Sequence, residues 1–485
     1  MKMKKRLDST RAALSFRILH FDFLHFAFCI LHYKSSDTLS EFRPLMRLAG
    51  PVILAEVGWM SMGLVDTIMV GPLGPAAIAA TGMGSSVFTA IAIFGMGLML
   101  GLDALVSQAH GAGDERDCVH WLHQGVWLAC GVAPIVMALT WFAFTTLDRW
   151  GLHPEIRNLV GPYLSVISSG ALPLLLYAAF RRYLQGMHVV RPIMIALVTA
   201  NLVNAAANWV LIYGNLGMPA LGVEGSAWAT TAARLYMAAF LYGAIRAHHR
   251  SRGHRHPHVT LGVDLARIGR LVTLGFPAAS QVALEVGVFA AATALAGRLD
   301  PVSSGSHQIA LNIASLAFMV PLGLSSAAAV RVGYAFGAGD RPRAAQAGWT
   351  AIASGCVIMT AIGLVFFLWP VSLIRVFTTD TRIIEIGVGL LAIAAAFQLF
   401  DGTQAVVTGA LRGISETRMP MVVNVIGHWL FGLPVGYLLC FRFNWGVAGL
   451  WIGLSIGLVV TAIVLTAVWW RKTLVMQNAE CRMRN

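Results

Sequence analysis

One stretch of this chain occurs twice, and the duplication limits the possible folds more than any other feature. Residues 51–114 align with residues 277–340 without a gap, and the identical positions include Gly, Pro and Asp where turns are expected. Chance similarity between apolar segments would align Leu and Ala instead. The identical pairs are Pro51/Pro277, Thr67/Thr293, Gly71/Gly297, Leu73/Leu299, Pro75/Pro301, Gly97/Gly323, Leu98/Leu324, Val106/Val332, Ala109/Ala335 and the tetrads Gly111–Asp114/Gly337–Asp340. The sequence therefore predicts a duplicated module, a building plan that is common among membrane transporters.

The composition places the chain in a membrane. Hydrophobic residues make up 57% of the 485 residues and charged residues only 12%, which is roughly half the charged share of a soluble protein. Apolar windows of about 20 residues recur along the whole length, and each is long enough to cross a ~30 Å hydrocarbon layer as a helix. The ~10-residue alternating segments of a β-barrel are absent. We therefore expect an all-α polytopic membrane protein rather than a soluble enzyme.

Twelve membrane-spanning helices are expected, six in each half of the chain. They are placed at about 46–70, 78–108, 120–144, 159–180, 191–213, 222–245, 269–297, 304–332, 346–371, 384–410, 419–440 and 446–470. Two six-helix lobes, an N-lobe at 45–247 and a C-lobe at 267–472, are expected to face a central cleft and to be related by an axis along the membrane normal. A basic cytoplasmic linker (248–266) joins them, and a cytoplasmic tail (473–485) follows. The N-terminal extension (1–44) is expected to lie on the cytoplasmic side or to reflect a start assigned too early, with Met46 near the true beginning.

The positions of Lys and Arg predict the orientation. With the N-terminus inside, most of the 35 Lys and Arg residues fall in inside segments, as the positive-inside rule requires. Both termini are therefore expected in the cytoplasm. These short basic segments beside a lipid bilayer explain the formal net charge of +13, so no nucleic-acid partner is expected. We expect a monomer.

Ionisable side chains inside apolar spans are costly to bury, so each needs a partner, a water-filled cavity or a function. The repeat helps to separate these explanations, because Asp66 aligns with Ala292 and Glu285 aligns with Trp59. The duplicated fold does not itself require these acids, which favours a functional role. The ionisable residues within the predicted spans are Glu56, Asp66, Asp103, Arg234, Glu285, His307, Arg331, Asp401 and His428.

Polar residues recur at helical spacing beside these acids, so that they share helix faces. The groups are Gln281 with Glu285, Gln308 with Asn312, Gln398 with Asp401 and Gln404, and Asn201 with Asn204 and Asn208. On helices from both lobes, such stripes would line an acidic cavity. Oxygen ligands suit a hard cation such as Na⁺, and buried carboxyl groups can also load and release protons. We therefore expect cation coupling at Glu285, Asp401 and Asp66, with Na⁺ as a candidate ion at Glu285 and Asp401. Substrate or supporting roles are expected for Gln308, Asn204, Asn208, Asn312, Gln281 and Gln404.

Each of these residues also has a structural interpretation. Asp66 alone could be a hydrogen-bonding partner inside the bundle. Asp103 and Arg331 lie near span ends, which favours roles at helix ends or interfaces. Buried histidines such as His307 and His428 are more often satisfied core residues than proton relays. The roles of Glu56, Asp103 and Arg234 stay open.

The Gly-Ala-Gly-Asp tetrads are expected to form tight turns. Each follows a long span and precedes a new helix, with Asp114 or Asp340 as the N-cap. A phosphate-binding loop would need a preceding strand and a Lys-Ser/Thr pair, and neither is present. No Ser-His-Asp set, zinc signature or nucleotide motif occurs, and the six cysteines include no C-x-x-C pair. We expect neither a catalytic function nor a cofactor.

Together these motifs resemble the multidrug and toxic compound extrusion (MATE) family. The resemblance covers about residues 45–470 and is nearest to the NorM-like bacterial branch. It is carried by Gly63–Gly71 (GLVDTIMVG), the two tetrads, Asn208-Trp209 and Leu411-Arg412-Gly413. The acids of the first, seventh and tenth spans of that branch correspond to Asp66, Glu285 and Asp401, its fifth-span asparagines to Asn204 and Asn208, and its H-Q-x-A-L-N segment to His307–Asn312. The chain departs from the branch at residues 1–44, Glu56 and Asp103.

The resemblance implies a multidrug antiporter of a bacterial inner membrane. In such a protein Na⁺ or H⁺ enters while an organic cation or another amphipathic drug leaves, as the two lobes alternate the side of access. The proton-coupled DinF-like branch fits less well, because Asn204 and Asn208 stand where a second N-lobe acid would be expected. Among the alternatives, a lipid or lipid-linked saccharide flippase needs a basic cavity, a membrane enzyme a catalytic cluster, and a channel a repeated filter loop. The sequence shows none of these.

Overall fold

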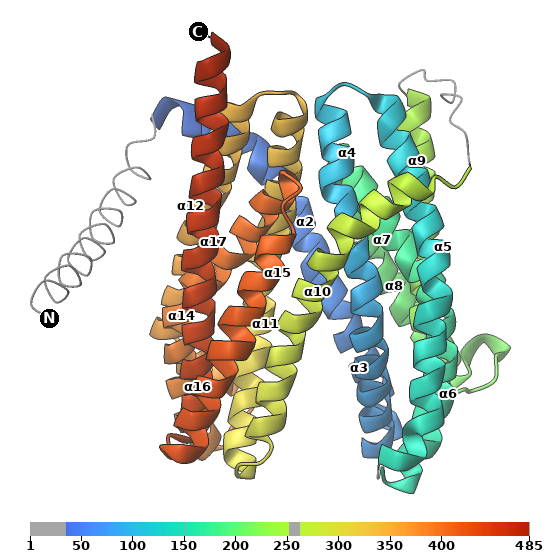
Figure 1. Ribbon diagram of the computed structural model, residues 1–485. Helices are drawn as coiled ribbons and strands as arrows, with labels where there is room; N and C mark the ends of the chain where they lie inside the picture. Colours follow the sequence, from blue (N-terminus) through green and yellow to red (C-terminus); the bar gives the residue numbers. More distant parts are fainter. Residues whose placement is uncertain (1–34, 151, 252–261, 485) are drawn as a thin grey trace, which may run out of the picture.

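The computed structural model describes residues 35–150, 152–251 and 262–484, which fold into helices joined by short turns (Figure 1). The first half contains α2 (Ser35–Val70), α3 (Pro75–Leu98), α4 (Gly101–Gly111), α5 (Glu115–Thr146), α6 (Pro154–Ser169), α7 (Ala171–Gly186), α8 (Arg191–Tyr213) and α9 (Val223–Ser251). The second half contains α10 (Leu265–Ala296), α11 (Pro301–Gly337), α12 (Arg341–Leu368), α13 (Pro370–Arg375), α14 (Thr381–Gly413), α15 (Arg418–Asn424), η4 (Val425–Gly432), α16 (Leu433–Tyr437), η5 (Leu438–Arg442) and α17 (Gly446–Arg484). Every predicted span lies on one of these helices or on a short run of them.

The helices have the length and composition of membrane spans. Within the described residues, ten are long and apolar enough to cross a membrane, and α6 with α7, bent by 44°, form an eleventh candidate. The remaining predicted span corresponds to α9, which has 29 residues. Large apolar side chains such as Leu64, Leu202 and Val357 are exposed by 62%, 68% and 71%, an arrangement that suits lipid and not water. The chain is a multi-pass α-helical membrane protein, as predicted.

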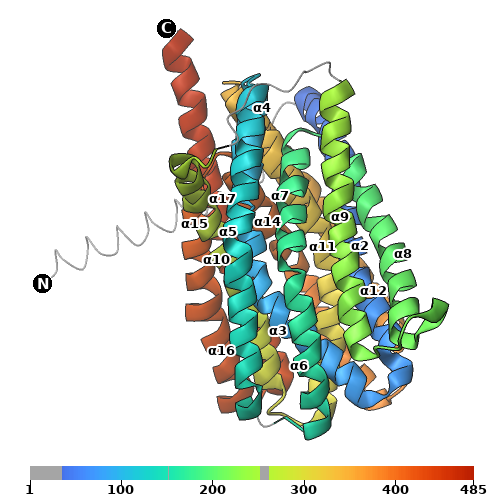
Figure 2. The same ribbon diagram turned by 90° about the vertical axis from the view of Figure 1, so that its right-hand side faces the viewer.

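The helices form two bundles that lie side by side (Figures 1 and 2). Helices α3 to α9 make up the N-lobe and α11 to α17 the C-lobe. The first helix of each half crosses between them. In Figure 1, α2 begins beside the C-lobe and descends into the N-lobe, while α10 begins beside the N-lobe and descends into the C-lobe. Accordingly, α2 contacts α11 and α12, and α10 contacts α3, α4 and α5.

The two tetrads form matching turns at one end of the bundle, which we name the turn end. The Asp114 carboxylate accepts a hydrogen bond from the Asp117 amide at 2.8 Å, and Asp340 accepts one from the Arg343 amide at 3.0 Å. The glycine directly before each Asp, Gly113 or Gly339, has a φ of 76° or 79°, a conformation that glycine adopts without strain. The predicted tight turns with Asp N-caps are therefore confirmed.

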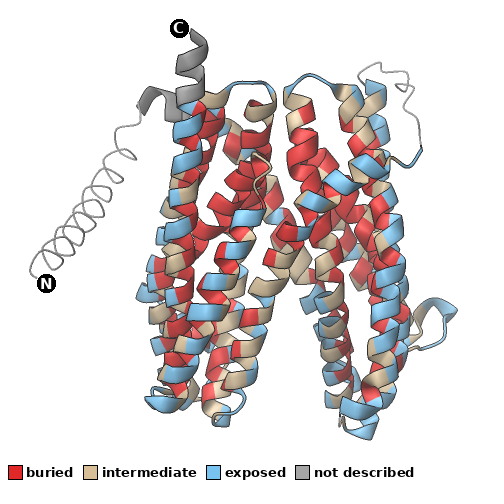
Figure 3. Ribbon diagram, in the orientation of Figure 1, coloured by how far each residue is buried: buried red, intermediate tan, exposed pale blue. Residues whose placement is uncertain are grey.

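The lobes touch most closely near the turn end, through glycines that the repeat relates. A Cβ at Gly111 would collide with the backbone of Tyr334, and one at Gly337 would collide with the backbone of Gln108. Glycine permits this approach because it has no side chain. Buried residues gather where the lobes meet toward this end, whereas exposed residues cover the outer faces (Figure 3). The turn end is closed.

Two predicted boundaries differ from the observed helices. Residues 35–44 belong to α2 rather than to a separate extension, because Glu41 in this segment is buried, with 3% of its surface exposed, against arginines of the C-lobe. Residues 473–484 are helical and continue α17, and their predicted place in a cytoplasmic tail stays a prediction. Residues 1–34 and most of the predicted linker (252–261) lie outside the described residues.

Candidate functional site

Two acids of the C-lobe converge in its interior. The half-buried Glu285 lies on α10 and the buried Asp401 on α14, close enough for the charge of Glu285 to act on the Asp401 carboxyl group. Gln404, one helical turn after Asp401, donates a hydrogen bond from Nε2 to Oε1 of Glu285 at 3.3 Å. Asp401 is 7% exposed. The structure thus brings together three residues that the sequence had grouped.

This C-lobe acid pair has few hydrogen-bonding partners for its charge. Among the described residues, the Asp401 carboxylate receives no side-chain hydrogen bond, and Glu285 receives only the one from Gln404. The nearby α14 amides are also incomplete, because both polar atoms of Gln398 and the Oε1 atom of Gln404 are buried without a partner. Buried polar groups are normally paired. Two carboxylates and unpaired amide oxygens are the groups that a hard cation or a shared proton would satisfy.

Gln281 lies one turn before Glu285 but bonds elsewhere. Its Nε2 atom donates to the Thr408 hydroxyl on α14 at 3.5 Å, so it links α10 to α14 beside the acid pair. On η4, the Trp429 indole donates to the backbone carbonyl of Leu284 at 3.0 Å, directly before Glu285. Sequence reasoning missed Trp429, because this contact depends on a π-helical segment that no local motif signals.

The histidine and the amides of the H-Q-x-A-L-N segment lie on different faces of α11. His307 is 1% exposed, and its Nδ1 accepts from the Trp451 indole at 3.0 Å, so Nε2 carries the proton toward the Thr293 hydroxyl, also 3.0 Å away. Both ring nitrogens are therefore used, as expected of a core histidine. Gln308 and Asn312 are exposed and do not join the acid pair.

The N-lobe acid has a complete set of partners. Asp66 accepts hydrogen bonds from Asn204 at 3.0 Å, Asn208 at 2.7 Å and the Thr230 hydroxyl at 2.8 Å. All three donors come from α8 and α9, and both asparagines are fully buried. Arg234, one turn beyond Thr230, adds a positive charge nearby and lies 4.5 Å above the Phe88 ring. The predicted Asn204 and Asn208 stripe therefore serves Asp66.

The hydrogen bonds of Asp66 and Glu285 do not connect the two lobes. Asp66 bonds only to N-lobe residues, whereas Glu285 bonds within the C-lobe. The hydrogen bonds place the acids at two sites, one in each lobe, and a cavity shared between them stays a prediction. Several other buried ionisable residues form ion pairs: Glu56 with Arg181, Asp103 with Arg182 and Arg412, and Arg331 with Glu41. His428 instead contacts the carbonyl of Asn424, four residues earlier, through Nδ1 at 3.3 Å.

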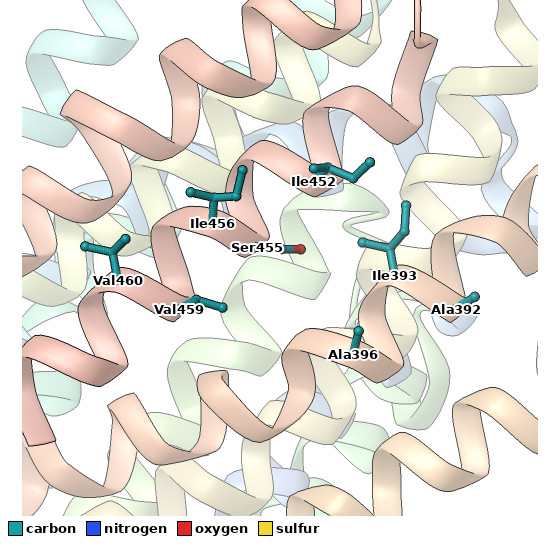
Figure 4. A pocket seen from close by; sticks show the side chains of 8 residues that line it. All are labelled: Ala392, Ile393, Ala396, Ile452, Ser455, Ile456, Val459 and Val460. Carbon is teal, nitrogen blue, oxygen red and sulfur yellow. The ribbon is translucent and has the colours of Figure 1, made fainter. Parts of the chain in front are cut away.

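A hollow on the surface of the C-lobe is not part of this site. It lies between α14 and α17 and is lined by Ala392, Ile393, Ala396, Ile452, Ser455, Ile456, Val459 and Val460 (Figure 4). Apart from one serine hydroxyl, this lining is apolar. It offers nothing that would bind a cation.

Comparison with known proteins gives consistent matches. The MatE family model matches residues 51–210 and 277–438, which begin at the two prolines that open the repeat. A probable multidrug resistance protein NorM of Mesorhizobium japonicum is 37% identical over 439 residues, covering 89% of this chain and 94% of that protein. The multidrug resistance protein MdtK of Edwardsiella ictaluri is 33% identical, with 88% and 94% covered.

Solved structures share the fold. The eukaryotic MATE transporter AtDTX14 superposes with a TM-score of 0.81 at 22% identity, covering 91% of this chain and 99% of that one. A transporter of the MOP superfamily from Pyrococcus furiosus superposes with a TM-score of 0.80 at 21% identity, with 90% and 97% covered. The two-lobe arrangement is therefore one that experimentally determined structures also adopt.

Proposed function

The chain belongs to the MATE family and is NorM-like, and from this premise we propose that it is a multidrug antiporter of a bacterial inner membrane that exports organic cations and other amphipathic drugs in exchange for Na⁺ or H⁺. It is a membrane transporter rather than an enzyme. Relatives named as multidrug resistance proteins match most of its length, which supports drugs as the exported compounds.

The observation that carries the coupling proposal is the incomplete bonding of the C-lobe acid pair. Two neighbouring carboxylates repel each other when both are charged, and burial increases that repulsion. A Na⁺ ion or a proton bound by Glu285 and Asp401 relieves it, using oxygen ligands that the protein leaves unpaired. The site can thus bind and release its cation without dismantling a hydrogen-bond network.

Cation binding is coupled to transport if it changes the relative stability of two conformations. A ligand shifts such an equilibrium only by its difference in affinity for the two states. Because Glu285 and Asp401 lie on separate helices, α10 and α14, a cation between them changes how these helices sit in the C-lobe. Asp66 is a second coupling acid in this proposal. Gln308 and Asn312, exposed on α11, are the substrate-facing amides.

The direction of access follows from the closed turn end. The positive-inside rule assigns this end to the cytoplasm. With the lobes in contact there, we propose that this conformation is accessible from outside. A drug cation enters from the cytoplasm in the opposite conformation and leaves as the coupling cation loads.

The test is efflux from reconstituted vesicles under an imposed Na⁺ or pH gradient. Glu285→Gln and Asp401→Asn keep the size of each side chain but remove its charge, so each should reduce gradient-driven export of a fluorescent organic cation to the level of empty vesicles. Glu56→Gln is the matched control, because Glu56 is a buried acid outside both coupling sites. Normal export by both neutral variants would disprove the assignment of the site. Comparing the two gradients identifies the coupling ion.

A further inference from the structure

The beginning of α2 is bound to the opposite lobe by charge. Glu41 contacts Arg331 on α11 and Arg343 on α12, the latter with Nε to Oε1 at 2.8 Å. The Glu41 side chain is 4% exposed and that of Arg331 is 9% exposed. Because α2 continues into the N-lobe, these contacts tie the N-lobe to the C-lobe at the turn end. We name them the Glu41 latch.

The beginning of α10 is bound to the opposite lobe in the same way. Arg267 contacts Asp117 on α5 of the N-lobe, and its guanidinium lies 5.0 Å above the Trp121 ring. The Trp121 indole in turn donates to Asp117 at 2.9 Å. These contacts, which we name the Arg267 latch, are about one-third exposed, with 31% for Arg267 and 29% for Asp117.

The internal repeat relates the two latches and inverts their charges. The alignment that places Pro51 on Pro277 also places Glu41 on Arg267 and Asp117 on Arg343. Each latch joins the first helix of one half to the helix after the tetrad of the other half. What recurs in both halves is the attraction between the two positions, while the sign at each position is exchanged.

We propose that the Glu41 latch and the Arg267 latch together hold the turn end shut, and that both must break for the lobes to separate there. The Glu41 latch is the stronger, because removing one partner of a buried ion pair leaves the other charge uncompensated. The Arg267 latch is weaker, because water and salt screen an ion pair that is about one-third exposed. The two latches therefore stabilise the closed turn end to different extents, and their combined strength sets the population in which this end is open.

The test is hydrogen–deuterium exchange of the full-length protein in lipid nanodiscs, followed at the amides of residues 105–113 and 331–338, where the lobes touch. Exchange there reports the population of the opened turn end. Glu41→Gln should raise it at least about tenfold, as expected for a broken buried pair. Asp117→Asn should raise it about two- to fivefold, as expected for a partly exposed pair. The double variant should exceed either.

Two further variants separate a latch from general destabilisation. Asp117→Arg combined with Arg267→Asp recreates the attraction with the charges exchanged, so it should return exchange toward the wild-type level. Glu56→Gln breaks a pair of similar burial with Arg181, 7% and 9% exposed, that lies within the N-lobe. It should lower the unfolding temperature without raising exchange at the turn end.

The proposal is overturned if folded Glu41→Gln protein shows wild-type exchange, if Glu56→Gln opens the turn end equally, or if the charge-exchanged pair fails to restore protection. It rests on the proposed alternation of access, but the exchange measurement requires neither a drug nor a cation gradient. If the exchange results agree with the latches but the reconstituted vesicles show no export, the proposed function is refuted and the latch proposal is not.

Discussion

The acids of the two lobes differ in how completely the protein satisfies them. Asp66 in the N-lobe has three side-chain donors within 3.0 Å and an arginine nearby. In the C-lobe, and among the described residues, Glu285 has one side-chain donor at 3.3 Å and Asp401 has none. Within the same part of the chain, a buried amide oxygen without a partner lies beside the acids of both lobes, at Asn208 and at Gln404. Asp66 and Asp401 are buried and Glu285 is half-buried, in similar helical bundles. In the duplicated fold, therefore, one acid has a full set of hydrogen-bond donors, and one pair of acids has few.

This difference separates what each site can do. A carboxylate with a full set of buried donors stabilises the charged state and the packing around it, and removing it leaves those donors unsatisfied. A pair of carboxylates with few donors is strained by its own charge, and it gains by binding a cation. In this conformation the comparison therefore favours the C-lobe pair as the cation site, while Asp66, the second coupling acid of the proposal, is held by its hydrogen bonds.

The largest expected effect is on stability. Asp66→Ala should lower the free energy of unfolding by about 3–5 kcal/mol, because Asn204, Asn208 and Thr230 lose their shared acceptor. Asp401→Asn should change it by less than about 1 kcal/mol, or raise it, because a repulsion is removed. Thermal unfolding in nanodiscs measures both. An Asp401→Asn variant as unstable as Asp66→Ala would show that the two sites do not differ in this way.

The next effect is linked to the cation. A ligand that binds the folded protein stabilises it by about 2.7 kcal/mol at a concentration of 100 Kd. If Na⁺ is the coupling ion, NaCl should raise the unfolding temperature of the wild type relative to an equal concentration of choline chloride. Glu285→Gln should abolish this increase, while Asp66→Asn, although less stable, should retain it. Loss of the increase in Asp66→Asn alone would place the cation in the N-lobe.

The difference between the lobes could be predicted only in part from the sequence. Helical spacing placed Gln404 beside Asp401, and the contact of Gln404 with Glu285 follows once α10 and α14 pack together. Two of the three partners of Asp66 could be grouped from the sequence, since Asn204 and Asn208 share a helix face. Thr230 was not, because nothing in α9 marks which residue will face α2. Cross-helix partners depend on packing angles that no local pattern contains.

The latches show a different limit of sequence comparison. Glu41 aligned with Arg267 counts as a mismatch, and so does Asp117 with Arg343. Identity scores positions one at a time, whereas an ion pair is a property of two positions. The segment before Met46 also resembled a separate extension, because the burial of Glu41 becomes evident only when Arg331 lies against it. The spans, the turns and the duplication are local or periodic features, so the sequence contained them.

The smallest expected effect concerns the orientation of Glu285 in the C-lobe site. Trp429 fixes the backbone of α10 at Leu284, next to Glu285, through one indole hydrogen bond. Trp429→Phe keeps a ring at this position but removes the donor, at a cost of about 1 kcal/mol. If that cost falls on the orientation of Glu285, the apparent cation affinity should fall about fivefold, while export at saturating cation stays near the wild-type rate.

The matched control for Trp429 is Trp451→Phe, which removes an indole bond of equal length, from α17 to His307 on α11, that does not involve the backbone of α10. It should cost similar stability without changing the cation concentration at half-maximal export. Equal shifts in both variants would mean that the C-lobe site responds to any loosening of its bundle. A shift in Trp429→Phe alone would show that the hydrogen bond from η4 positions α10 and, with it, Glu285. The C-lobe acid pair would then depend on a neighbouring helix for its orientation, whereas Asp66 is positioned by the hydrogen bonds that it accepts directly.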